Sequence, residues 1–287
     1  MPHALKQALL HAAAAMAAAL MAPATGAQSI GRGDQRAWVQ LGVMGAGIDS
    51  LIRVDYLGNS GLGLPAAGTT LDFEDDLGLR RRKAVPSVVL GLRLAERWHL
   101  EFETYSLTRS ATQTVLDEAV VIGGTTYSAT AQLQSSFSSR VQRLSLGYGL
   151  FKTPTAELGV AVGVQYTRYR LAFVGTGSVN GEPPSVSRVE ESDRGPLPTA
   201  GLFGSVALSD AWSSAARVDY MPVDSKRLRG YLGNVEANLY YRMAPNWSLG
   251  LGYKAVSYKV VRKSDGDFGA RFEYRFRGPQ VLLEAGW

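Results

Sequence analysis

The last ten residues of the chain, Gly278 to Trp287, alternate between apolar and polar side chains. Every second position counted back from the end is apolar, namely Trp287, Ala285, Leu283 and Val281, whereas the other parity is mostly polar or small. A period of two is typical of a β-strand with one apolar face. Such a strand is either a wall of a membrane-embedded sheet or an ordinary edge strand of a soluble sandwich, and the rest of the chain has to decide between them.

The same alternation recurs along the chain and predicts ten strands, with eight as the alternative number. Short turns are expected at 95–97, 152–155, 209–210 and 243–246, and longer connections at 55–83, 112–131, 175–195 and 222–229. Transmembrane up-and-down barrels have short periplasmic turns and longer external loops, whereas a soluble sandwich has no reason to alternate in this way. We therefore predict an all-β fold, a transmembrane up-and-down antiparallel β-barrel with both chain ends on the periplasmic side.

Residues 1–27 have the pattern of a secretory signal peptide. Lys6 precedes an apolar run from Ala8 to Ala22, and small residues up to Ala27 offer a cleavage site. A membrane-anchoring helix is disfavoured because the run is short for a span. We expect a cleaved signal peptide over 1–27 and one barrel domain over 28–287. Cysteine is absent from the sequence, which excludes disulfides and thiolate chemistry.

The five tryptophans all fall at strand ends that this topology places at the periplasmic rim. Indole rings favour the membrane interface, so we predict a periplasmic aromatic girdle of Trp38, Trp98, Trp212, Trp247 and Trp287. An outer girdle of tyrosines is expected from Tyr105, Tyr166, Tyr220, Tyr253 and Tyr274.

The last strand, from about Phe268 to Trp287, contains a break in its pattern. Its first part, Phe272 to Arg277, has its apolar residues on the opposite parity from Val281 to Trp287. Pro279 lacks the N–H of a ladder hydrogen bond. We expect a β-bulge near Gly278 and Pro279 that exchanges the two faces.

With the signal peptide, the alternating strands and the terminal Trp287, the chain resembles the small monomeric outer-membrane β-barrel proteins of Gram-negative bacteria. The acidic segment Leu71-Asp-Phe-Glu-Asp-Asp-Leu-Gly78 in the first external loop resembles one group of these proteins. The resemblance covers the mature chain and implies an outer-membrane location, a monomer, and recognition of the C-terminal strand by the barrel-assembly machinery. The loop motif implies no activity.

Charged residues of inward parity are expected to form a network inside the lumen, because an unpaired buried charge is costly. The predicted members are Arg93, Glu101, Glu103, Arg143, Arg217, Asp219, Glu236, Lys254 and Glu284. Glu101 and Glu103 could alternatively act as an acid/base pair.

His99 is the one histidine of the mature chain, and it lies near the periplasmic rim, whereas outer-membrane hydrolases use histidine clusters at the outer face. We therefore predict no catalytic, cofactor or metal site and no enzymatic activity.

The outer rim is expected to be basic, in keeping with the formal charge of +5. Cations at this level can meet lipopolysaccharide phosphates, and the predicted contacts are Arg80, Arg81, Arg82, Lys83, Lys226, Arg227 and Arg229. A nucleic-acid partner is not expected for an exported barrel.

Asp72, Glu74 and Asp76 could hold a divalent cation, but we favour a solvated acidic loop neutralised by the neighbouring arginines.

The sequence thus predicts an outer-membrane protein with a structural or surface-interaction role, a lumen filled by side chains and external loops that contact lipopolysaccharide. A narrow porin-like pore for ions or small solutes is the alternative, since the interior of small barrels is just wide enough for side chains to fill. An outer-face enzyme acting on lipid A or peptides is a weaker third hypothesis.

Overall fold

The computed structural model describes residues 35–56, 69–113, 120–122, 125–127, 133–178, 185–224, 228–262 and 268–287. The predicted signal peptide, Lys226 and Arg227 lie outside these ranges. None of the described residues belongs to a helix long and apolar enough to cross a membrane.

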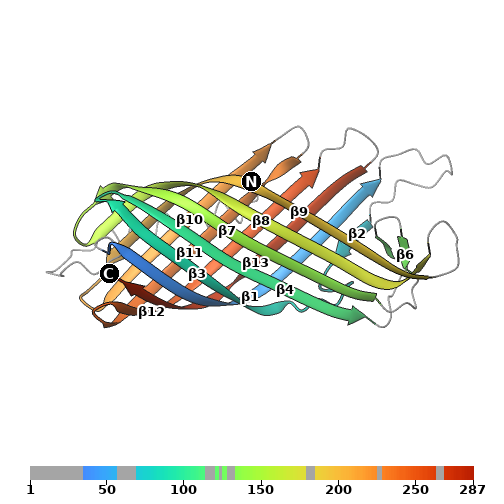
Figure 1. Ribbon diagram of the computed structural model, residues 1–287, viewed down its shortest axis with the longest axis horizontal. Coiled ribbons are helices and arrows are strands. Elements are labelled where there is room, and N and C mark those ends of the chain that lie inside the picture. The colour runs from blue at the N-terminus through green and yellow to red at the C-terminus, as the bar shows by residue number, and fades with distance from the viewer. Residues whose placement is uncertain are drawn as a thin grey trace.

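Ten long antiparallel strands close into a barrel, as the sequence predicts (Figure 1). Each strand pairs with its neighbour along the chain, and β13 pairs with β1, where Trp38 lies opposite Gly286. The consecutive strands β8 and β9 are also paired, so each of the ten strands has a neighbour on both sides. In order, the ten strands are β1 (Ala37–Tyr56), β3 (Arg82–Ala95), β4 (Trp98–Gln113), β7 (Leu133–Lys152), β8 (Ala156–Ser178), β9 (Ser185–Ala207), β10 (Trp212–Asp224), β11 (Leu228–Ala244), β12 (Trp247–Arg262) and β13 (Phe268–Gly286).

The four predicted short turns are confirmed, whereas only two of the four expected long connections are long: β8 and β9 are separated by residues 179–184 alone, and β10 and β11 by residues 225–227. One end of the barrel carries the tight turns 96–97, 153–155, 208–211 and 245–246 together with the C-terminus, at the left of Figure 1. The opposite end carries the other connections, which include three short strands, β2 (Thr69–Asp72), β5 (Val120–Ile122) and β6 (Thr125–Tyr127). By the topology of membrane barrels, the end with the tight turns is periplasmic and the other is external.

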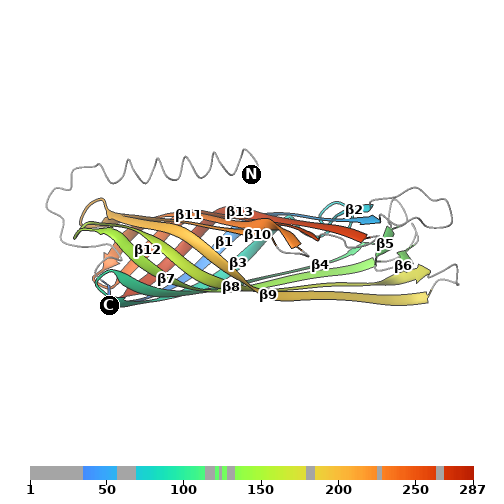
Figure 2. The same ribbon diagram turned by 90° about the horizontal axis from the view of Figure 1, so that it is seen from above.

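The connection predicted at 175–195 is mostly strand. β8 continues to Ser178 and β9 begins at Ser185, and the two pair with each other as far as Gly177 and Ser185. β9 pairs with β10 only between Ala200 and Ala207, so its outer part is held in the sheet by β8. This hairpin reaches beyond the other strands at the external end (Figure 2).

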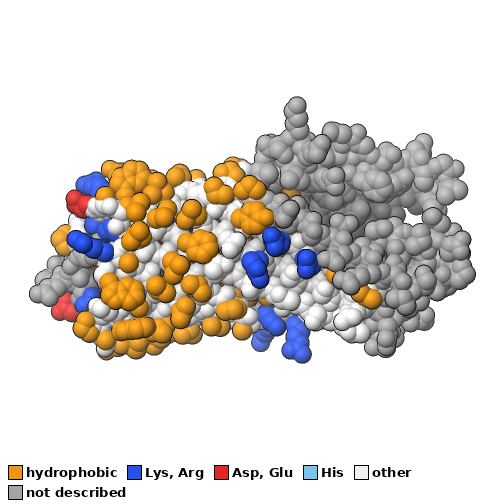
Figure 3. Space-filling view, in the orientation of Figure 1, with side chains coloured by type: hydrophobic (Ala, Val, Ile, Leu, Met, Phe, Trp, Pro, Cys, Tyr) orange, Lys and Arg blue, Asp and Glu red, His pale blue; other side chains and the backbone are white. Residues whose placement is uncertain are grey.

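A broad apolar band covers the periplasmic half of the face seen in Figure 3. Its members are exposed leucines and valines from most of the strands, for example Leu41, Leu144, Val162 and Leu251. A soluble protein rarely exposes so large an apolar patch, whereas a membrane barrel needs a band about 25 Å tall. The band shows that these strands are built to face lipid.

Four tryptophans sit at the periplasmic margin of this band with exposed side chains, Trp98, Trp212, Trp247 and Trp287. Trp38 does not join them, and its inclusion in the girdle was wrong. Its side chain is 2 % exposed because it has the inward parity of β1, shared with Gln40 and Met44, and it packs in the lumen. Two of the predicted outer tyrosines, Tyr105 and Tyr274, are also buried inside the barrel, whereas Tyr253 is exposed.

The predicted bulge near Gly278 and Pro279 is absent. β13 keeps one register with β12 from Trp247 opposite Ala285 to Arg262 opposite Ala270. All four of Tyr274, Phe276, Gln280 and Glu284 point into the lumen. The parity change arises because the lumen is polar at the level of the apolar band, where Gln280 and Glu284 lie, and apolar above it, where Tyr274 and Phe276 lie. Above the band the outward residues of β13, such as Arg275 and Arg277, are charged and exposed.

Candidate functional site

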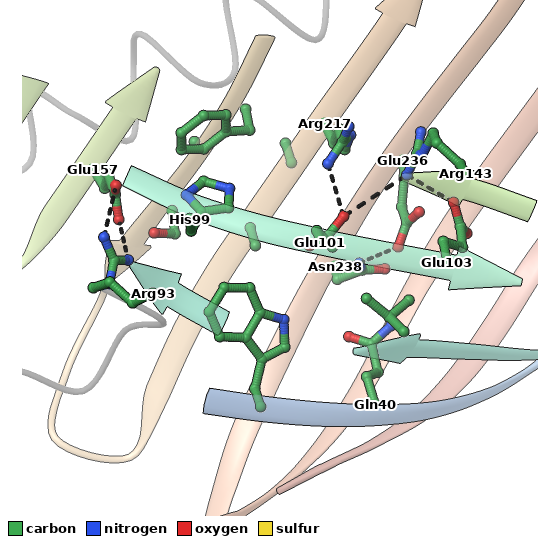
Figure 4. Close-up of a pocket in the computed structure, with 17 residues that line it drawn as sticks. Gln40, Arg93, His99, Glu101, Glu103, Arg143, Glu157, Arg217, Glu236 and Asn238 are labelled. Carbon is green, nitrogen blue, oxygen red and sulfur yellow. Dashed lines mark hydrogen bonds and ion pairs between the residues drawn. The ribbon is translucent and has the colours of Figure 1, made fainter. Parts of the chain in front are cut away.

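The periplasmic part of the lumen holds a small cavity of about 60 Å³ next to His99 (Figure 4). The imidazole is buried between Trp38 and Phe203, with ring centroids at 5.8 and 4.6 Å. On one side, Arg93 forms two hydrogen bonds with Glu157, at 3.3 and 2.8 Å. The volume is sufficient for a few water molecules, and the Nδ1 atom of His99 has no hydrogen-bond partner among the described residues.

A chain of alternating charges crosses the lumen in the middle of the barrel. Arg217 of β10 donates to Glu101 of β4 at 2.7 Å and to Asp219 at 3.0 Å. Arg143 of β7 pairs with Asp219 and lies 2.7 Å from Glu103. These contacts connect β4 and β7 on one wall to β10 on another, so the network spans the interior.

The network of charges extends to the strands β11 and β12 through Lys254 of β12. Its ammonium pairs with Glu103 and lies 3.1 Å from Glu236 of β11. Asn238 and Gln280 donate to the same Glu236 carboxylate at 2.7 and 3.0 Å. Each charge of this network is therefore paired or hydrogen-bonded, which is the condition for keeping ions inside a low-dielectric interior.

All nine residues of the predicted lumen network are directed into the barrel. Seven of them, all except Arg93 and Glu284, form the continuous chain of charges described above. Arg93 instead pairs with Glu157, which the sequence reasoning missed although it lies on the inward parity of β8. Glu284 is buried further toward the periplasmic end, beyond Leu282 on the same strand. The predicted pair Glu101 and Glu103 faces Arg143, Arg217 and Lys254.

The external half of the lumen is an aromatic core. Its described members include Phe137, Tyr258, Tyr274 and Phe276, all at most 3 % exposed. Phe137 and Tyr274 have ring centroids 5.3 Å apart.

Part of the first external loop, residues 73–79, enters this core. Phe73, Leu77 and Leu79 have essentially no exposed surface. The Phe73 ring lies 5.8 Å from Phe137 and 6.5 Å from Phe272. We refer to residues 73–79 as the plug. The sequence interpretation treated this acidic segment as solvated; its apolar residues 73, 77 and 79 were the signal that could have placed it inside.

A buried ion pair fastens the plug to the wall. Glu74 accepts a hydrogen bond from the Ser50 amide at 2.8 Å and pairs with the Arg109 guanidinium. Arg109 also donates to the Ser50 hydroxyl at 2.6 Å and lies 5.4 Å from the Phe137 ring centroid. The side chains of Glu74 and Arg109 are 0 and 1 % exposed. This pair was not predicted, although Arg109 lies on the inward parity of β4 that it shares with Glu101 and Glu103.

The acidic residues of the loop do not form a cation site. Asp72 accepts hydrogen bonds from the amides of Glu74 and Asp75 at 2.9 and 2.8 Å, and Asp76 accepts one from the Asp72 amide at 2.7 Å. These carboxylates cap their own turn, while that of Glu74 points into the lumen. The described residues contain no cluster of three or more acidic, histidine or cysteine side chains placed to hold a metal ion.

The basic outer rim lies just above the apolar band. Arg80, Arg82, Lys83 and Arg229 are exposed there. Arg81 is also exposed, but its guanidinium donates hydrogen bonds to Asp75 at 2.5 Å and to Asp49 at 3.3 Å, and the hydrogen bond to Asp75 raises the pKa of the Arg81 guanidinium. Further exposed arginines at this level come from β7, β8 and β13, namely Arg140, Arg168, Arg170, Arg271, Arg275 and Arg277. Figure 3 shows blue side chains along this margin of the band.

Comparison with solved structures agrees with this geometry. The outer-membrane protease OmpT of Escherichia coli superposes with a TM-score of 0.58 over 90 % of this chain and 98 % of that chain, at 14 % sequence identity. The chain has the fold of a Gram-negative outer-membrane β-barrel. Weaker similarities include the toluene transporter TodX of Pseudomonas putida, with 10 % identity over 94 % and 93 % of the two chains and a TM-score of 0.38.

The attachment invasion locus protein Ail of Yersinia pestis is also similar, at 9 % identity over 85 % of this chain and 99 % of that chain, with a TM-score of 0.28. No protein-family model matches the sequence, and no curated protein is significantly similar to it.

Proposed function

We propose that this chain is a non-enzymatic outer-membrane protein whose closed barrel serves as an anchor and whose external rim and loops contact lipopolysaccharide and other surface partners. The observation that carries this proposal is the filled lumen. The chain of charges from Glu101 to Glu236 crosses the middle of the barrel, and the aromatic core with its plug occupies the external half. The one lumen cavity noted above, near His99, is of water size and ends at the charged layer.

The alternative of a narrow pore can be tested in planar lipid bilayers. The refolded mature protein is expected to give no single-channel steps, because an ion would have to displace both paired charges and a dry core. Heat-denatured protein serves as the control for adventitious leaks. Uniform conductance steps that only the folded protein produces would overturn the closed-lumen proposal.

The similarity to OmpT, a protease by its name, raises enzymatic activity as a question for this chain. We propose that there is none, because the sequence has histidine only at positions 3, 11 and 99, and His99 is buried at the periplasmic end. Incubation of the folded protein with a mixed peptide library and with lipid A, followed by mass spectrometry, is expected to leave both unchanged. Turnover that is lost on heating would contradict the proposal.

Contact with lipopolysaccharide is supported by the basic rim at the level of the lipid head groups. The test is the binding of lipopolysaccharide to the detergent-solubilised protein at several salt concentrations. Changing Arg80, Arg81 and Arg82 to serine should weaken binding and flatten its salt dependence. The matched control changes three arginines at the periplasmic end, Arg36, Arg97 and Arg242, to serine, and an equal effect of both sets would reject a role for the external rim.

The same proposal includes a monomer that reaches the outer membrane after signal cleavage and whose β13 strand is recognised by the barrel-assembly machinery. Cell fractionation, the mass of the mature N-terminus and sedimentation in detergent test these points. Recovery of the full-length chain from the inner membrane would contradict them.

A further inference from the structure

A shallow groove crosses the outer surface where β13, β1 and β3 run side by side. Its floor is the outward face of β1 at Gly45 and Gly47, which have no side chains, together with Ala84 of β3. Below it the outward residues are apolar, such as Val43 of β1 and Val281 of β13, both about half exposed. The groove therefore begins inside the apolar band and ends at its external margin.

Cations stand at the external end of this groove. Gly47 lies opposite Arg82 on β3 and opposite Arg277 on β13, so the two arginines flank it in register. Adjacent strands are about 4.8 Å apart, which places the two backbones about 9.6 Å from each other. Side chains of this length can converge on one anion. Both arginines are exposed and, within the described part of the chain, neither has an ion-pair partner, in contrast to Arg81.

The floor is open rather than packed. A Cβ atom built on Gly45 would meet nothing closer than 3.9 Å, and one on Gly47 nothing closer than 3.5 Å. Glycines on the lumen face differ, because a Cβ on Gly91 would lie 1.8 Å from the Trp38 ring. Packing therefore does not require glycine at positions 45 and 47. An extended apolar chain can lie along this floor, with the Tyr253 ring on one side.

We propose that this groove binds one lipopolysaccharide molecule, with a lipid A phosphate between Arg82 and Arg277 and an acyl chain on the floor formed by Gly45, Gly47 and Ala84. The proposal rests on the proposed contact with lipopolysaccharide and assigns it to one site. Charge complementarity selects a phosphorylated lipid, and the position of the cations at the external margin of the band selects the external leaflet. Guanidinium groups suit phosphate because they donate paired hydrogen bonds.

Native mass spectrometry of the detergent-solubilised mature protein tests this site. With bisphosphorylated lipid A, one bound molecule is expected. Dephosphorylated lipid A and phosphatidylglycerol should each bind at least tenfold more weakly. Equal binding of dephosphorylated lipid A would remove the phosphate from the proposal, and equal binding of phosphatidylglycerol would make the groove a general site for anionic phospholipids; either result overturns it.

Two pairs of variants separate the groove from the rest of the basic rim. Arg82→Gln with Arg277→Gln should reduce lipid A affinity at least tenfold, whereas Arg140→Gln with Arg168→Gln, which removes the same charge from β7 and β8, should not. If both pairs cause the same loss, binding is a diffuse effect of charge and the site proposal fails.

The floor is tested without any change of charge. Gly45→Leu with Gly47→Leu fills the groove from outside the barrel and should reduce affinity at least tenfold while the protein still folds. Ala200→Leu, on the lipid-facing side of β9 across the barrel, is the control and should have no effect. Unchanged binding by the glycine variant would overturn the groove but leave rim contact intact, whereas no lipid A binding by the wild-type protein would overturn both proposals.

Discussion

Replacement of Arg109 by methionine should release the plug from the mouth of the barrel. The guanidinium is the ion-pair partner of Glu74 and also donates to the Ser50 hydroxyl. Methionine retains much of the apolar length of arginine and its contact with Phe137, so the change removes the charge more than the packing. The Glu74 carboxylate would then be left in a buried site with the Ser50 amide as its remaining donor.

The magnitude follows from the burial of the pair. Removing one partner of a buried ion pair costs about 3–5 kcal/mol, because the other charge stays in a low dielectric. The plug can avoid this cost by leaving the lumen, so the loss appears as local opening rather than as unfolding of the whole barrel. At about 1.4 kcal/mol per factor of ten, the population of the open mouth should rise roughly 10²- to 10⁴-fold.

Amide hydrogen exchange on the folded protein in detergent measures this opening. The Phe73 amide, which donates to the Ser50 carbonyl at 3.0 Å, and the Leu79 amide, which donates to the Phe73 carbonyl at 2.9 Å, should lose protection by that factor. Amides of β12 should not change. In the double variant Arg109→Met with Glu74→Gln, most of the protection should return, since no charge is left unpaired. Additive effects of the two changes, or unchanged exchange in Arg109→Met, would refute the reasoning.

Three further outcomes are expected. Gly91→Ala should lower the free energy of unfolding by about 1–3 kcal/mol in urea titrations, because its Cβ would overlap the Trp38 ring. When Trp38 has already been changed to alanine, the same Gly91→Ala change should cost much less. An equal cost in both backgrounds would place the clash elsewhere. Arg143→Met should cost about 3 kcal/mol, the low end for a broken buried pair, since Lys254 and Arg217 still face its two carboxylates; a loss below 1 kcal/mol would show that the network is solvated. A cysteine at position 275 should react with a membrane-impermeant thiol reagent added outside intact cells, whereas one at position 274 should not; the reverse would favour a bulge at Pro279.

The sequence was sufficient for the wall of the barrel because a period of two is set by the backbone and not by the surroundings. The ten strands, the tight turns and the inward parity of the charged residues all follow from it. Trp38 shows where the pattern fails. Both parities of β1 are largely apolar near its start, with Val39 and Leu41 on one and Trp38 and Met44 on the other, so the sequence does not say which face is inside.

The external half of the barrel was harder to predict because its outer surface faces water and not lipid. We interpreted the parity change before Pro279 as a bulge, on the assumption that the apolar face always looks at lipid. Apolar side chains avoid water, whichever side of the sheet the water is on. Because the outer surface above the membrane faces water, Phe276 and Tyr274 lie in the lumen there, without any change of register. The plug follows the same rule, since Phe73 and Leu77 complete that core. The apolar residues of the plug indicate burial, whereas the strands that they contact are distant in the sequence and are not given by the local pattern.

The two halves of the barrel are therefore stabilised differently by one continuous sheet. At the level of the apolar band the outer surface is already solvated by lipid, so the lumen can be polar provided that each charge has a partner, as in the chain from Glu101 to Glu236. Above the band the outer surface is in water, and the strands need an apolar interior like that of a soluble domain. A loop that merely covered a channel would not need to bury Phe73, Leu77 and Leu79. Since these three side chains form part of the external core, the plug is a structural element of that core.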